Sequence, residues 1–222
     1  MILVIPQRVV KFTLMHYLRV RNRFGKPKAP SLYYFAYGAN LDANRFKKYR
    51  MNYEAVGVAR VPDYALTFTF PCEYLGKGYA DIAAEPGGTV WGFVYKLDWV
   101  SFFLLDVMEW AAFNQYRRIP VEAILQDGTR LVVEAYQARY PREGLAPSQL
   151  YLTNIVKSSV LHGFPDDYRA RLEKVVPGEK FELDPSFSFL HPPKPRWGAR
   201  KFRRLYLAHD RFREWVCDRL RF

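Results

Sequence analysis

A glutamate with apolar neighbours is the first residue that could do chemistry. Glu109 follows Met108 and precedes the sequence WAAF at positions 110–113. Removing a carboxylate from water favours its protonated form, and carboxyl groups prepared in this way serve as general acids and bases. A solvated helix residue beside apolar neighbours would give the same pattern, so both interpretations stand at this point.

A glycine at the end of an aromatic run is the second candidate. Residues 32–37 (LYYFAY) have the composition of a buried strand, and Gly38 ends the run. Asn40 is a favoured helix N-cap, and a short polar helix is predicted after it. Such a junction presents unpaired backbone N–H groups to an anion. An ordinary strand-to-helix turn is the alternative, and the pattern of a nucleotide phosphate loop is absent.

Other reactive residue types do not cluster in the sequence. The four histidines lack the spacing of a metal site, so no metal is expected. Cys72 and Cys217 are too few and too far apart for a disulfide framework, which predicts two free thiols in a reducing compartment.

The elements that must position these candidates follow from the hydrophobic pattern. Strands are predicted at 53–61, 64–70, 80–84 and 90–97, with a turn at 85–88, and a hairpin with an Asp-Gly turn at 118–140. Helices are predicted at 99–110, which carries Glu109, and at 148–162 and 166–174. Strands that precede helices indicate an α+β fold with a mixed or antiparallel sheet.

The net charge of +12 lies at the two ends of the chain. Residues 1–32 and residues 190–222 each carry a net +7, whereas residues 33–189 are near −2. We therefore divide the chain into a basic N-terminal extension and linker (1–31), a central domain (32–184) and a basic C-terminal extension (185–222). A nucleic-acid partner is not expected, because the central domain is not basic and could not extend a nucleic-acid-binding surface from the two basic extensions.

The C-terminal extension has an apolar stripe at helical spacing, formed by Phe202, Leu205, Tyr206, His209, Phe212, Val216 and Leu220, with arginines between these residues. Three surfaces could cover the stripe: the body of the protein, a second subunit in a homodimer, or an anionic membrane surface. The N-terminus lacks the order of charges and the cleavage site of a signal peptide, and no apolar run is long enough to cross a bilayer. A cytoplasmic protein is expected, with association to a membrane as the alternative.

Several motifs together resemble the gamma-glutamylcyclotransferases. Residues 34–41 (YFAYGANL) resemble the YFAYGSNL signature of that family, and 90–97 (VWGFVYKL) resemble its VWG strand. Residues 105–109 (LDVME) end in Glu109, and 147–151 (PSQLY) end in Tyr151, while 163–168 (GFPDDY) resemble a further family stretch. The resemblance covers about 32–181, roughly two-thirds of the chain.

The resemblance implies a fold, a reaction and a set of site residues. The expected fold is a mixed β-barrel with flanking helices. The expected reaction is cleavage of a small gamma-glutamyl amide by its own α-amine, which releases 5-oxoproline and needs no cofactor and no metal. Glu109 would be the catalytic acid and base, and Tyr116 and Tyr151 would line the pocket. The substrate carboxylate would bind backbone N–H groups of the loop formed by Tyr37, Gly38, Ala39, Asn40 and Leu41.

Two departures from the family pattern bear on substrate choice. Ala39 replaces the serine of the signature, and residues 110–115 (WAAFNQ) are bulkier than the glycine-containing family stretch. The identity of the gamma-glutamyl compound therefore stays open. A non-catalytic member of the family, used as a binding or scaffold module on a membrane, an RNA or a large assembly, is the alternative function.

Overall fold

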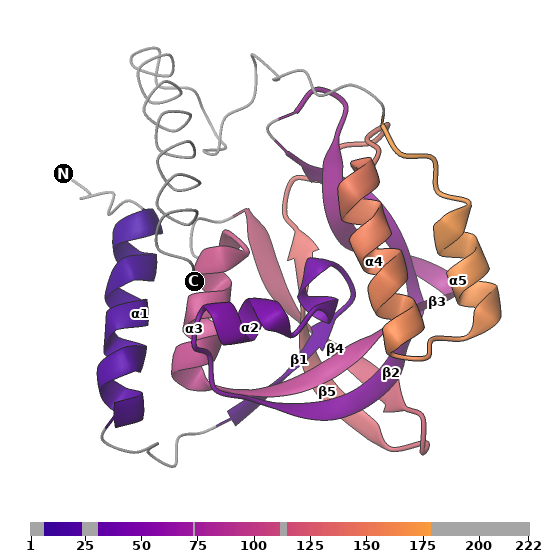
Figure 1. The fold of residues 1–222 in the computed structure, drawn as a ribbon. Coiled ribbons are helices and arrows are strands. Elements are labelled where there is room, and N and C mark those ends of the chain that lie inside the picture. Colours follow the sequence, from indigo (N-terminus) through magenta and orange to yellow (C-terminus); the bar gives the residue numbers. More distant parts are fainter. Residues whose placement is uncertain (1–6, 24–30, 73, 112–114, 179–222) are drawn as a thin grey trace. The chain divides into compact units, whose positions relative to one another are not determined.

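A closed β-barrel forms the centre of the part of the chain that the structure describes (Figure 1). Its strands are β1 (Ser31–Ala36), β2 (Tyr53–Pro71), β3 (Gly78–Asp98), β4 (Tyr116–Leu125) and β5 (Arg130–Ala138). Their order around the barrel is β1-β3-β2-β4-β5, and β1 pairs with β5 in parallel while the other pairs are antiparallel. The predicted α+β fold with a mixed barrel is therefore confirmed.

The computed structural model describes residues 7–23, 31–72, 74–111 and 115–178. The predicted linker at 25–30 and the C-terminal extension at 185–222 lie outside the described residues, and so does its apolar stripe. The expectations for the extension and its partners therefore remain predictions. None of the described helices has the length and hydropathy of a membrane-spanning segment.

β1 and β3 approach each other closely at a glycine. A Cβ atom on Gly92 would lie 2.4 Å from the carbonyl oxygen of Ala36 and 2.5 Å from the ring of Phe35. Both contacts are far inside van der Waals distance, and Phe35 is fully buried in the core. Glycine at this position therefore allows the close approach of β3 to the end of β1, where Ala36 pairs with Phe93.

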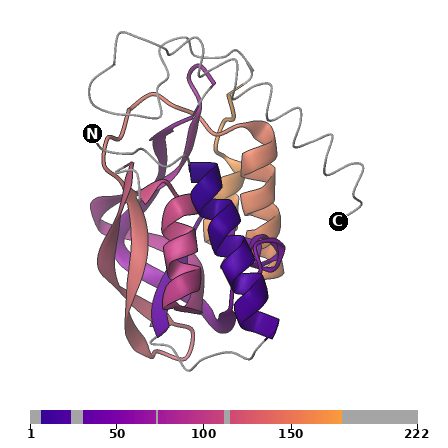
Figure 2. The same ribbon diagram turned by 90° about the vertical axis from the view of Figure 1, so that its left-hand side faces the viewer.

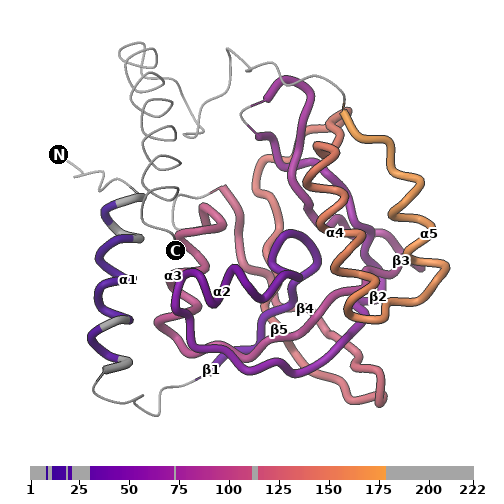
Figure 3. The backbone as a smooth tube through the Cα atoms, in the orientation of Figure 1, coloured from indigo at the N-terminus to yellow at the C-terminus, as the bar shows by residue number. Residues whose placement is uncertain are grey.

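β2 and β3 are longer than the sequence predicted, because each joins two predicted strands into one (Figure 3). The predicted turn at 85–88 is present as an irregularity inside β3, since the pairing jumps from Pro62↔Thr89 to Tyr64↔Ala84. Asp63 and Gly87 have positive φ angles there, and the Gly87 N–H donates to Asp63 Oδ1 at 2.9 Å. The ladder continues across this excursion, so the turn chemistry bends the strand without ending it.

Helices cover two sides of the barrel (Figures 1 and 2). They are α1 (Gln7–Arg23), the 3-10 turn η1 (Ala39–Leu41), α2 (Asn44–Lys48), α3 (Trp99–Met108), α4 (Gln149–Leu161) and α5 (Asp166–Glu173). The side chains of Asp98 and Ser148 cap α3 and α4 at their N-termini. Asn40, in contrast, is not the predicted N-cap: it lies inside η1, whose N-cap is Gly38.

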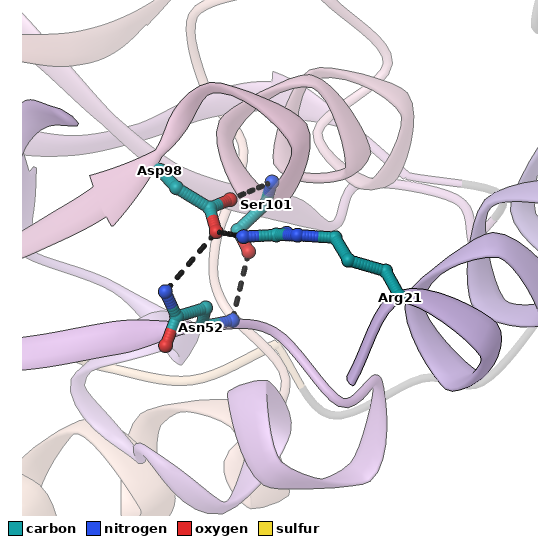
Figure 4. A network of polar contacts seen from close by, with 4 residues as sticks. All are labelled: Arg21, Asn52, Asp98 and Ser101. Atoms are coloured by element: carbon teal, nitrogen blue, oxygen red, sulfur yellow. Dashed lines mark hydrogen bonds and ion pairs between the residues drawn. The ribbon is translucent and has the colours of Figure 1, made fainter. Parts of the chain in front are cut away.

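α1 was not predicted from the sequence, and it lies beside α3 in both ribbon views (Figures 1 and 2). Leu18 on α1 is fully buried. The Arg21 guanidinium forms a buried ion pair with Asp98, the residue that ends β3 and caps α3 (Figure 4). Asp98 also accepts hydrogen bonds from the Ser101 N–H at 2.8 Å and from Asn52 Nδ2 at 3.1 Å. One carboxylate thus joins α1, the barrel and α3.

The charge on Asp98 is stabilised by its donors. Burial on its own raises the pKa of this carboxyl group, but hydrogen bonds from Arg21, Ser101 and Asn52 outweigh burial and bring the pKa below its usual value. Arg21 is less well satisfied, because its Nε and Nη1 atoms are buried without a partner among the described residues. Loss of Asp98 would therefore leave a buried guanidinium without its counter-charge.

We predict that Asp98→Asn destabilises the protein while keeping the N-cap of α3, because asparagine also caps helices well. Breaking a buried ion pair on one side costs about 3–5 kcal/mol of unfolding free energy. Urea unfolding at pH 7 measures this loss, and Glu122→Gln, which breaks the exposed pair with Arg130, is the matched control with a loss of about 1 kcal/mol or less.

The difference in unfolding free energy between wild type and Asp98→Asn should depend on pH. Because the folded pKa of Asp98 is lowered, the ionised group stabilises the native state above its unfolded pKa of about 3.9. That stabilisation disappears as the pH falls through the folded pKa, so wild type and Asp98→Asn should converge in acid. A difference that stays constant down to pH 2 would contradict this account.

Candidate active site

Glu109 stands at the C-terminal end of α3, where it is the C-cap residue. Its N–H donates to the Leu105 carbonyl at 2.8 Å, and the residue is half-buried. Trp110 follows with a φ angle of 57°, a left-handed conformation that ends the helix at once. The chain therefore turns away directly after Glu109 and leaves the carboxylate at the end of the helix.

The loop after β1 reaches Glu109 through the side chain of Asn40. Asn40 Nδ2 donates to Glu109 Oε1 at 2.9 Å and to the Tyr34 hydroxyl at 2.8 Å. Asn40 is only 4% exposed. The two predicted parts of the site, which are 69 positions apart in the sequence, are thus joined directly by a hydrogen bond.

Tyr34 provides a fixed support for Asn40. Its ring is buried and makes edge contacts with Phe46, Phe102 and Tyr136, with centroid separations between 5.6 and 6.5 Å. Burial raises the pKa of Tyr34 well above its usual value, and the charge of Glu109 raises it further. The phenol therefore stays protonated at neutral pH.

Tyr116 and Tyr151 meet at one residue of β3. The Tyr116 hydroxyl donates to the Ala80 carbonyl at 2.7 Å, and the Ala80 N–H donates to the Tyr151 hydroxyl at 3.2 Å. The pairing of β2 with β3 is irregular at this point, because the register shifts between Thr67 and Phe70. That irregularity turns the backbone groups of Ala80 toward the two tyrosines instead of toward β2.

Tyr151 also touches the loop after β1. A Cβ atom on Gly38 would lie 3.0 Å from the Tyr151 hydroxyl, which explains why glycine suits this position. Burial raises the pKa of Tyr151 to about 12, while the backbone groups of Ala80 and Ala39 lower it. In these contacts the hydroxyl oxygen accepts hydrogen bonds from N–H groups, so its own hydrogen is not used by them.

Tyr37 and Leu41, at the two ends of the loop, are held by hydrogen bonds to the rest of the fold. The Tyr37 hydroxyl donates to the Tyr136 carbonyl, and Tyr37 is buried. The Leu41 carbonyl accepts from the Tyr95 hydroxyl at 3.1 Å and lies 2.9 Å from His162 Nε2. These contacts bind the loop to the barrel wall and to the end of α4.

Two of the predicted carboxylate donors are already engaged. The Leu41 N–H bonds to the Gly38 carbonyl at 3.0 Å within η1, and the backbone of Ala39 interacts with Tyr151. The N–H groups of Gly38 and Asn40 are not used by these internal bonds. The loop thus offers fewer donors than the sequence suggested.

Sequence reasoning did not assign Tyr34, His162 or Arg45 to the site. Tyr34 was taken as part of a strand and as the first residue of the YFAYGANL motif, without a role of its own. His162 is 121 positions from the carbonyl it contacts, so spacing gave no signal. Arg45 on α2 is half-buried, and its charge lowers the pKa of both Tyr34 and Tyr151. Its place in a polar helix adjoining the loop was the available hint.

The described residues therefore bring together the Glu109 carboxylate, the Asn40 amide and several phenols. The buried Asp81 carboxyl group also raises the pKa of two of these phenols, Tyr37 and Tyr116. The charge of Glu109 raises the pKa of Tyr116 and of Tyr151 in addition to burial. Within the described part of the chain, no group of three or more histidine, cysteine, aspartate or glutamate side chains could hold a metal ion. What the arrangement can do is exchange a proton at Glu109 beside neutral hydrogen-bond donors.

Comparison with known proteins identifies the family of this chain. The model of the AIG2-like family matches residues 89–172. A gamma-glutamylcyclotransferase from Bos taurus is 31% identical over 154 residues, which cover 67% of this chain and 81% of the bovine protein. The gamma-glutamylcyclotransferase of Homo sapiens is 30% identical over 161 residues, with 69% and 83% covered. A solved structure of a gamma-glutamyl cyclotransferase superposes with a TM-score of 0.63 at 28% identity, covering 70% of this chain and 95% of that one. The chain belongs to the gamma-glutamylcyclotransferase family of enzymes.

Proposed function

We propose that the protein cleaves a gamma-glutamyl amide by intramolecular attack of the α-amine, releasing 5-oxoproline and an amine, an amino acid or a peptide. The observation that carries the proposal is the hydrogen bond between Glu109 and Asn40, which places a half-buried carboxylate directly beside the loop after β1. The family relationship supports the same reaction class.

The chemistry follows from the protonation state of the substrate. An α-ammonium group with a pKa of about 8 must lose a proton before its nitrogen can attack. Glu109 accepts that proton, and the nitrogen then forms a bond to the γ-carbonyl carbon, which closes a five-membered ring. The amide C–N bond breaks in turn, and Glu109 returns the proton to the leaving nitrogen. The ring nitrogen loses its second proton to the solvent, and the released amine takes up a proton to leave as an ammonium ion at neutral pH. Atoms and charges balance, and holding the two ends of one molecule together supplies much of the rate.

The α-carboxylate of the substrate needs donors close to Glu109. We assign this role to the N–H groups of Gly38 and Asn40, which lie at the beginning of η1. Arg45 adds a positive charge whose effect reaches both Tyr34 and Tyr151. Such a charge favours a carboxylate at the loop and would steer the substrate to bind with its amino acid end inward.

Stabilisation of the oxyanion distinguishes the two pocket tyrosines. The hydrogen of the Tyr116 hydroxyl is directed at the Ala80 carbonyl. The Tyr151 hydroxyl instead accepts the Ala80 N–H, so its hydrogen remains available for the developing charge on the γ-carbonyl oxygen. We assign the oxyanion donor to Tyr151 and a supporting role to Tyr116.

Release of 5-oxoproline from a panel of gamma-glutamyl compounds tests the function. The panel includes gamma-glutamyl amino acids, gamma-glutamylamines and glutathione, because these share the reacting end and differ only in the leaving group. Turnover of at least one compound supports the proposal. Absence of 5-oxoproline from the whole panel, with a folded protein, would overturn it for these substrate classes.

We predict that Glu109→Gln lowers kcat by about 10²–10⁴-fold, because the amide keeps the shape of the side chain but cannot accept the proton. The melting temperature should stay within a few degrees of wild type. The exposed variant Glu122→Gln, which makes the same chemical change on β4, should keep full activity. Near wild-type release of 5-oxoproline by Glu109→Gln would remove Glu109 from the mechanism.

We predict that Tyr151→Phe lowers kcat more than Tyr116→Phe. Loss of one oxyanion donor costs about 10²–10³-fold in kcat. Loss of the Tyr116 hydroxyl leaves the Ala80 carbonyl without that donor, which should reduce stability by about 1–3 kcal/mol and change kcat little. Steady-state kinetics and thermal unfolding of both variants check the assignment, and the reverse order of the kcat effects would show that the roles are exchanged.

A further inference from the structure

We infer that the side chain of Asn40 has two functions in this site: its nitrogen positions the Glu109 carboxylate, and its oxygen binds the α-ammonium group of the substrate. The inference rests on the proposed function, because it assigns a ligand group to the same site. It goes beyond the backbone donors of the loop, since it concerns the amide side chain and the cationic end of the substrate.

The hydrogen bonds of this amide can be counted completely. A primary amide carries two N–H donors and one oxygen acceptor. Both donors are used, one by Glu109 at 2.9 Å and one by Tyr34 at 2.8 Å. The oxygen Oδ1 is buried and has no partner among the described residues. Asn40 therefore presents a single unused acceptor inside the site.

The orientation of the amide follows from the chemistry of its neighbours. An ionised carboxylate only accepts hydrogen bonds, so the nitrogen of Asn40 must face Glu109. The opposite orientation would place the amide oxygen against a carboxylate oxygen, and the contact would be repulsive. Tyr34 lies in the same direction and is fixed by the packing of its ring. The oxygen therefore belongs to the same planar group as the nitrogen that contacts Glu109.

The unused oxygen calls for a donor from outside the chain. A buried acceptor without a partner is unfavourable, and such groups in folded proteins are normally satisfied. The substrate proposed here carries an ammonium group, which has three donors and no acceptor. An ammonium group bound at Oδ1 lies beside the carboxylate that must take its proton. The oxygen of the Asn40 amide would then hold the ammonium group, its nitrogen would hold the Glu109 carboxylate, and the proton would pass between them in the first step of the reaction.

A purely structural role for Asn40 makes different predictions. An asparagine that only ties the loop to α3 would affect stability and the rate at every pH, without preference for ligands that carry an amine. The two proposed functions can be separated, because Asn40→Asp keeps an oxygen acceptor but removes the donor to Glu109, whereas Asn40→Ala removes both.

The nitrogen function is tested with the full-length Asn40→Asp protein. A second carboxylate beside Glu109 makes the two groups titrate as a coupled pair and disfavours the ionised form. We expect the acid limb of the pH profile of kcat/KM to move up by about one unit or more, with a loss of about 10–100-fold at pH 7. Asn44→Asp makes the same change at an exposed position of α2 and should leave the profile unchanged. An Asn40→Asp profile that coincides with wild type would overturn the positioning role.

The oxygen function is tested by calorimetric binding of L-glutamine and of glutaramate, which lacks only the α-amine. Wild type should prefer L-glutamine by about 10-fold or more, since the ammonium gains a charge-assisted hydrogen bond. Asn40→Ala should lose most of that preference, and Asn40→Asp should retain it. Full preference in a folded Asn40→Ala protein would overturn the assignment. Binding is read without turnover, so this result is independent of the 5-oxoproline assay that tests the proposed function itself.

Discussion

The hydrogen bond between Asn40 and Glu109 is the contact on which the site depends. It joins the loop after β1 to the end of α3, and neither element could fix the distance between them alone. The loop is held because the Leu41 carbonyl and the Tyr37 hydroxyl are tied to the barrel wall. The helix end is held because Asp98 starts α3 at the other end and joins it to β3 and α1. The rest of the fold keeps the loop after β1 and the end of α3 at the distance that this hydrogen bond requires.

The barrel also sets the electrostatics of the site. Burial raises the pKa of Tyr34, Tyr37, Tyr116 and Tyr136 well above the usual value, and the negative charge of Glu109 contributes in each case. These phenols are therefore neutral donors at any physiological pH. Neutral donors of this kind leave the proton transfer of the proposed reaction to a carboxylate, which is the separation of roles that acid–base catalysis requires. In the proposed reaction the loop and Arg45 recognise the charge of the substrate, and Glu109 moves the proton.

Local signals predicted the parts of this arrangement that depend on local chemistry. Gly38 after an aromatic run, the Asp-Gly hairpin and the apolar stretch of α3 all gave elements that the structure contains. Contacts between distant residues were not predictable in this way. The role of Asn40 in η1 was mistaken for an N-cap because its true partner is 69 positions away. α1 was missed because its basic residues were assigned to an extension outside the central domain, and the partner of Arg21 is 77 positions distant. The sequence predicted four strands in place of β2 and β3, because residues typical of turns, such as those at 85–88, also occur where a long strand bends.

The conformation of Trp110 shows how the sequence departs from the family pattern without losing the site. A residue with a side chain in the left-handed region costs about 1–2 kcal/mol, which glycine would avoid. The conformation persists where the surroundings determine it on both sides. Here the Glu109 N–H completes the last turn of α3, and the Gln115 N–H bonds to the Trp110 carbonyl at 3.1 Å. A helix continued by one more residue would rotate the next side chain by about 100° and carry the chain past the loop. The position of Glu109 therefore requires the backbone turn itself, which Trp110 provides here in place of the glycine that commonly occupies a left-handed position.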